Sequence, residues 1–198
     1  MDLAELQQLI RNSKPEDFVI NNILSNDCPH FKPEQLEHVR KSIAEVTGIN
    51  IKDNEIYVVG SAKLGFGLHQ KTKRDGEILP AFRPFNADSD IDIAFASAEL
   101  FDMVWQEVST FAFSQTRFPA RINKLGDYLV YGWLRPDHFP RDTRLLNYDR
   151  WNDKVRSLGR DQLLGRRKIS GALYRNVEFV TKYQARGINT CKKLLELS

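Results

Sequence analysis

Two aspartates, Asp90 and Asp92, stand one residue apart in the stretch "NADSDIDIAFA", residues 86–96. Apolar residues alternate with them, which is the side-chain period of a β-strand. The two carboxylates should therefore leave the same face, with Cα atoms about 6.6 Å apart. Carboxylates held this close repel each other unless a cation or hydrogen bonds compensate. Because Mg²⁺ and Mn²⁺ prefer oxygen ligands of this kind, we predict that Asp90 and Asp92 hold such a metal.

A second candidate site lies upstream, in "IYVVGSAKLGFGL", residues 56–68. A buried strand that ends in Gly60-Ser61 lets backbone N–H groups approach phosphate oxygens closely, especially if a helix begins there. Lys63 would add a positive charge to the same phosphates. Two metal ions held by the aspartates could activate an attacking hydroxyl and stabilise a leaving pyrophosphate. The two stretches together therefore indicate phosphoryl-transfer chemistry more strongly than either does alone.

The elements that must position these residues follow from periodicity. A helical front, residues 1–50, contains an amphipathic helix that begins at Pro33 and stops at Gly48. Short strands are predicted at 55–60 and 90–96. A helix at 98–108, a late strand at 168–175 and a closing helix at 176–197 follow, whereas 114–168 has no readable period. The pattern predicts one α/β domain of the α+β kind over 1–198, with a motif-bearing core at 54–110 and a tail at 111–198 that completes it.

Composition narrows the functional class. The sequence has no apolar run near the roughly 20 residues that a membrane helix needs, and its first residues lack the pattern of a signal peptide. With only Cys28 and Cys191, a disulfide framework is not expected. We therefore predict a cytoplasmic protein without a membrane partner. Residues 141–168 carry nine Arg or Lys against four Asp, so this basic span is either a polyanion-binding surface or a solvated face.

The arrangement of an apolar strand, Gly60-Ser61 and a strand with Asp90-x-Asp92 resembles the nucleotidyltransferase fold of the DNA polymerase β superfamily. The resemblance covers residues 54–110 and implies a small mixed sheet flanked by helices, here with an N-terminal helical extension. The wording "VGSAKLGFGL…FRPFNADSDIDIAF" is similar to stand-alone bacterial nucleotidyltransferases of anti-phage defence systems, such as the synthase of the Hailong system.

The resemblance implies a function. Asp90 and Asp92 would be catalytic and bind Mg²⁺ or Mn²⁺, while Gly60, Ser61 and Lys63 would bind the triphosphate of an NTP or dNTP. A nucleoside monophosphate would pass to a hydroxyl acceptor with release of pyrophosphate. The acceptor would be an oligonucleotide or nucleotide 3′-OH, or a protein hydroxyl. The product would be a nucleotide signal in phage defence, with an effector protein encoded nearby as a candidate partner.

Two departures from the family pattern leave an alternative open. The gap between Ser61 and Asp90 is longer than in minimal members, with residues 69–86 as the evident insertion. The third carboxylate of the family is also not obvious, because the late strand has none. Only weak candidates remain: Glu178, Asp127 and Asp137. The alternative is a catalytically inactive module of this fold that binds nucleotide, nucleic acid or a partner toxin.

Other residues have more ordinary interpretations. Gly65 and Gly67 are expected to be turn residues, because positive φ is the commonest use of glycine. The aromatic residues Tyr128, Tyr131 and Trp133 are expected to pack in the core or scaffold.

Overall fold

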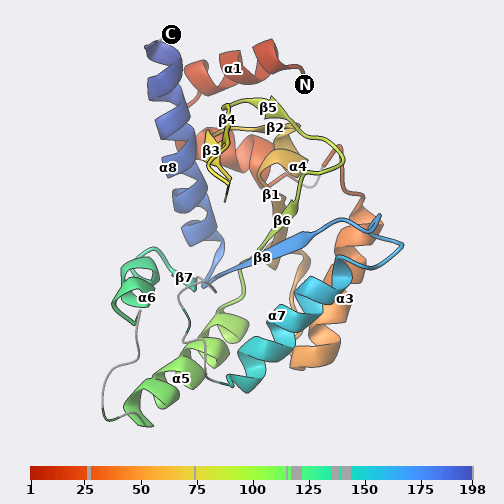
Figure 1. The fold of residues 1–198 in the computed structure, drawn as a ribbon, viewed down its shortest axis with the longest axis vertical. Helices are drawn as coiled ribbons and strands as arrows, with labels where there is room; N and C mark the ends of the chain where they lie inside the picture. The colour runs from red at the N-terminus through yellow and green to blue at the C-terminus, as the bar shows by residue number, and fades with distance from the viewer. Residues whose placement is uncertain are drawn as a thin grey trace.

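A four-stranded mixed sheet with helices on both faces forms the centre of the molecule (Figure 1). The computed structural model describes residues 1–25, 28–73, 75–114, 116, 122–134, 139 and 144–197. In spatial order the strands are β1 (Ile56–Val59), β6 (Ile91–Phe95), β8 (Ile169–Tyr174) and β7 (Trp133–Leu134). β6 runs parallel to β8, while the two outer pairs are antiparallel. The expected α+β class with a small mixed sheet is confirmed.

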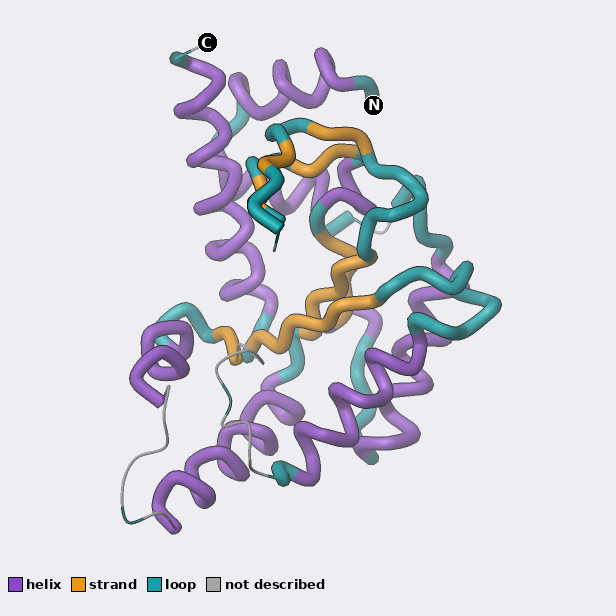
Figure 2. Tube along the Cα trace, viewed as in Figure 1, coloured by secondary structure: helices purple, strands orange, loops and turns teal. Residues whose placement is uncertain are grey.

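Helices make up most of the remaining described chain (Figure 2). One face of the sheet is covered by α3 (Pro33–Thr47), α5 (Ala98–Ser114) and α7 (Leu146–Leu158). The other face is covered by α1 (Leu3–Asn12), α2 (Pro15–Phe18), a π-helical segment (Val19–Ile23), α4 (Ser61–Leu64) and α8 (Val177–Glu196). A further helix, α6 (Ile122–Leu129), leads into β7. No helix of the described residues is long and apolar enough to cross a membrane.

Alternation along β6 divides the interior into two apolar cores. Ile91, Ile93 and Phe95 lie in the core shared with α3, α5 and α7. Ala94 lies in the core shared with α1, α2 and α8. Because side chains two residues apart share a face, Asp92 belongs to the face of Ala94, over which α8 packs.

The predicted helical front and most predicted elements are confirmed. α3 ends where Gly48 takes a left-handed conformation, and the late and closing segments are β8 and α8. The sequence interpretation missed α7, whose apolar positions are separated by many charged residues. Trp151 and Val155 nevertheless bury that helix against the sheet, with the Trp151 ring edge-on to Phe95 at 5.7 Å. Tertiary packing therefore decided what the periodicity of this segment did not.

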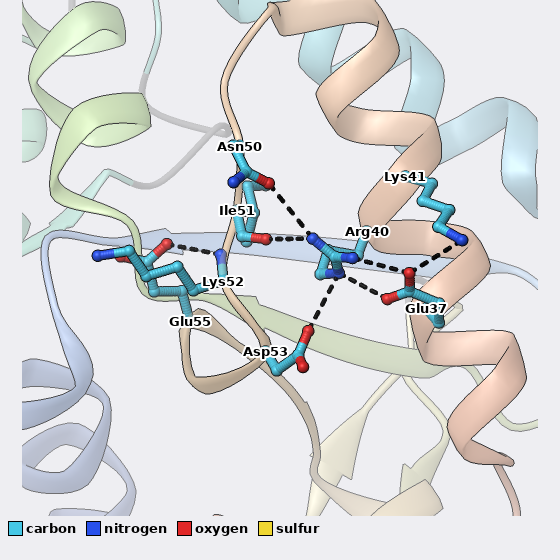
Figure 3. A network of polar contacts seen from close by, with 8 residues as sticks. All are labelled: Glu37, Arg40, Lys41, Asn50, Ile51, Lys52, Asp53 and Glu55. Atoms are coloured by element: carbon cyan, nitrogen blue, oxygen red, sulfur yellow. Dashed lines mark hydrogen bonds and ion pairs between the residues drawn. The ribbon is translucent and has the colours of Figure 1, made fainter.

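A network around Arg40 fixes the entry into β1 (Figure 3). The Arg40 guanidinium donates to the Ile51 carbonyl at 2.7 Å and to both oxygens of Glu37, at 2.6 and 2.7 Å. This bidentate contact lowers the pKa of Glu37 to about 2. α3 is thereby tied to the segment that leads into the strand ending at Gly60.

The segment between the two motif strands, which includes the predicted insertion, forms two small antiparallel pairs. β2 (Phe66–Gly67) pairs with β5 (Arg83–Pro84), and β3 (Lys71–Thr72) pairs with β4 (Ile78–Leu79). Figure 1 shows both pairs beside α8 and α4. These two strand pairs therefore lie next to the motif-bearing part of the sheet.

Candidate active site

Gly60 and Asp92, thirty-two positions apart in sequence, meet at one end of the sheet. The antiparallel register places Val59 opposite Asp92, so the residue after β1 lies beside that carboxylate. Gly60 has φ +68° and ψ −147°, a backbone region that is essentially restricted to glycine. A Cβ added there would lie 3.0 Å from Oδ2 of Asp92. Both the backbone conformation and the close approach thus require glycine at position 60.

The two aspartates form a region of concentrated negative charge. Asp90 precedes β6, and Asp92 lies within it and is partly buried. Burial is the main cause that raises the pKa of Asp92, and the Asp90 carboxylate raises it further, while Lys168 and Lys71 oppose the shift. Since the ionised form of Asp92 is destabilised here, a bound cation would be favourable between these carboxylates.

Lys168 occupies the place opposite Asp90. β6 and β8 pair Ile91 with Ile169 and Asp92 with Ser170, which sets Lys168 across from Asp90. The Lys168 ammonium forms an ion pair with Oδ2 of Asp90. The central strand β8 therefore presents an ammonium and a hydroxyl, not a carboxylate, beside the two aspartates.

The weak candidates for a third carboxylate lie on other elements. Glu178 is in the first turn of α8, where it pairs with Lys182 at 2.6 Å. Asp127 is on α6, and Asp137 lies outside the described residues. Over the residues described, no group of three or more His, Cys, Asp or Glu could hold a metal ion. Mg²⁺ is commonly bound by one or two carboxylates together with substrate phosphates and water, and the Asp90–Asp92 pair fits that mode.

The predicted phosphate-binding residues differ in exposure and in the direction of their side chains. Ser61 begins α4 directly after Gly60 and is partly exposed. Lys63 is buried, and its ammonium donates to Ser25, 2.5 Å to the carbonyl and 3.1 Å to the hydroxyl. The side chain thus contacts the segment after the π-helical turn, so its predicted contact with phosphates gains no support. Gly65 has φ +81°, as a turn residue does.

Two lysines at the site were missed by the sequence interpretation. Lys71 on β3 is exposed and acts electrostatically on Asp92, and Lys168 pairs with Asp90. Lys71 lies in the predicted insertion, residues 69–86, and Lys168 is the first residue of the predicted late strand, residues 168–175. These positions are the only features of the sequence that could have drawn attention to the two lysines. Neither position predicts that the side chain reaches the aspartates.

Most of the basic span lies away from the site. Its helix, α7, packs on the sheet face opposite Asp92, and residues 141–143 lie outside the described chain. The end of the span does return to the site. Arg167 stacks over the Phe85 ring at 5.0 Å and donates to the Asn86 carbonyl at 2.8 Å, next to Lys168.

Comparison of the chain with protein-family models, with curated proteins and with solved structures finds no match.

Proposed function

We propose that this chain is a metal-dependent nucleotidyltransferase of the polymerase β type, which transfers a nucleoside monophosphate from an NTP or dNTP to a hydroxyl acceptor. The observation that carries the proposal is the contact between the two motifs. Gly60, the residue after β1, lies against the Asp92 carboxylate, where an added Cβ would be only 3.0 Å from Oδ2. The sequence resemblance predicts this juxtaposition of the two motifs.

Each residue of the site has a proposed task. Asp90 and Asp92 would hold Mg²⁺ or Mn²⁺, which when bound neutralises phosphate charge and lowers the pKa of a coordinated hydroxyl. Gly60 and Ser61 would leave space for the triphosphate, and the exposed Lys71 ammonium would attract it electrostatically. Positioning and charge neutralisation of this kind account for most of the catalysis in phosphoryl transfer.

A second candidate function is favoured by the Lys168–Asp90 ion pair. An ammonium at the position opposite Asp90 neutralises part of the charge that a metal would otherwise neutralise. An inactive module that binds nucleotide, nucleic acid or a partner toxin through the same residues would have an ammonium in place of a bound metal. The two functions differ in turnover, which a direct assay measures.

The test is incubation of the purified protein with each labelled NTP and dNTP plus Mg²⁺ or Mn²⁺, followed by separation of the products. Asp90→Asn with Asp92→Asn is expected to abolish product formation while the fold persists. Asp153→Asn is the matched control, because Asp153 is an exposed aspartate on α7, which packs on the opposite face of the sheet. Nucleotide binding without turnover in the parent would favour the inactive module, and unchanged turnover in the double variant would refute the proposed site.

The resemblance to defence-system nucleotidyltransferases extends the proposal to a physiological role. The product would act as a nucleotide signal during phage infection, and an effector protein encoded nearby would receive it. A binding measurement between such an effector protein and the purified reaction products tests this role.

A further inference from the structure

A groove between α6 and α8 lies outside the residues assigned so far. It has a volume of about 690 Å³, within the range of ligand sites. Tyr128 and Tyr131 line it from the α6 side, Tyr183 and Arg186 from α8, and His69 from the loop between β2 and β3. We call this the α6–α8 groove. Its walls are aromatic faces with polar groups between them.

Stacked aromatic rings connect this groove with the Asp92 face of the sheet. The Tyr128 ring lies 6.3 Å from Tyr131 and 5.2 Å from Trp133, and Trp133 stacks on Tyr174 at 5.7 Å. Tyr174 ends β8 and is buried there. The rings thus form a continuous series from the exposed groove to the end of β8, on the face of the sheet that carries Asp92. Tyr174 lies four residues beyond Ser170, the partner of Asp92, so about 13 Å of strand separates this ring from the candidate active site.

Arg186 gives the groove an available positive charge. Its guanidinium stacks over the Tyr131 ring, 5.3 Å from the centroid. Within the described part of the chain, Arg186 takes part in no ion pair. Tyr131 is 43% exposed, although a buried packing role was expected for it. An exposed tyrosine stacked with an unpaired arginine offers both a π surface and a cation.

These features suit unpaired nucleobases better than a duplex, whose bases already stack on one another. Proteins that bind single strands combine aromatic platforms for the bases with cations for the backbone. Asp127 also lines the groove, so phosphates would be repelled from that wall while an amino group of a base could donate to it. The charge pattern therefore places bases in the groove and phosphates toward Arg186.

We propose that the α6–α8 groove binds the bases of a single-stranded oligonucleotide whose 3′ end reaches the Asp92 site. That this strand is the acceptor of the transferred nucleotide rests on the proposed function. Among the acceptors left open there, the inference selects an oligonucleotide over a protein hydroxyl. It also places the strand apart from α7, the helix of the basic span, which packs on the opposite face of the sheet.

The test is fluorescence anisotropy with a 5′-fluorescein-labelled single-stranded DNA octamer and its RNA counterpart. Tyr131→Ala is expected to weaken binding of at least one of them by roughly 5- to 150-fold, the range for loss of one base–aromatic stack. Tyr131→Phe keeps the ring and should stay within about 2-fold of the parent on the same argument. Phe113→Ala is the control, because Phe113 is an 84% exposed aromatic residue on α5. Thermal melts establish that each variant is folded.

Any of three results would overturn the inference. Neither octamer binds the parent, Tyr131→Ala binds both octamers as tightly as the parent does, or Tyr131→Ala loses affinity for a mononucleotide but not for the octamers. Failure of the proposed function has a different signature. If the octamer binds in the groove but no nucleotide is transferred to it, the binding site stands and the transferase activity does not. If transfer proceeds while Tyr131→Ala binds the octamer normally, the transferase activity stands and the groove is not the binding site.

Discussion

Removing the Lys168 ammonium should tighten metal binding at Asp90 and Asp92. In the structure this ammonium is paired with Asp90, so a metal that uses Asp90 must first displace it. The Lys168 side chain is 71% exposed and that of Asp90 is 29% exposed, so the pair belongs with exposed ion pairs. Such pairs contribute about 0.2–1 kcal/mol. Relief of that competition alone should lower the Mn²⁺ dissociation constant of Lys168→Met roughly 1.5- to 5-fold.

The assay is titration of the apo protein with Mn²⁺, with free Mn²⁺ followed by electron paramagnetic resonance. Lys168→Glu should bind Mn²⁺ more tightly than Lys168→Met, since the strand register puts the new carboxylate opposite Asp90. Lys193→Met is the control, an exposed lysine in the last turn of α8. Equal Mn²⁺ affinity in the parent, Lys168→Met and Lys168→Glu would refute the reasoning that Lys168 competes for the metal site.

Three further predictions concern the same region. Gly60→Ala should cost roughly 1–3 kcal/mol in urea unfolding and weaken Mn²⁺ binding, because its Cβ meets Asp92. The control Gly48→Ala, at φ +74° with no atom within 4 Å of its Cβ, should lose stability but bind Mn²⁺ normally. The raised pKa of Asp92 means that the folded protein binds this proton more tightly than the unfolded chain does, so stability is lost as pH rises above 3.8. Asp92→Asn without metal should therefore have a higher Tm than the parent at pH 7, and the difference should shrink toward pH 4; a constant difference would contradict this cause. Finally, Arg166→Gln with Arg167→Gln should make octamer binding less sensitive to salt. The slope of the logarithm of the binding constant against the logarithm of the salt concentration should fall by about two at most, one for each lost phosphate contact. An unchanged slope would mean that neither arginine contacts a phosphate of the octamer.

Local pattern was sufficient for much of the fold. The alternation of Ile91, Ile93 and Phe95 predicted β6 and the face on which Asp92 lies, because side-chain direction in a strand depends only on sequence parity. The amphipathic spacing from Pro33 to Gly48 predicted α3 and its end at Gly48, which the structure shows in a left-handed conformation. α7 escaped prediction because its buried face is defined by contacts with α3 and the sheet, among residues whose local charge resembles a solvated surface.

The candidate site was predictable only in its parts. The sequence by itself determined that Gly60 ends one strand and that Asp90 and Asp92 accompany another, since each feature depends on neighbours in the chain. Only the tertiary structure decided that Gly60 touches Asp92, that Lys168 stands opposite Asp90, and that Lys63 points to Ser25. The physical reason is that contacts between strands and helices depend on their register and packing, which are set by burial over the whole domain and leave no local periodic signal in the sequence.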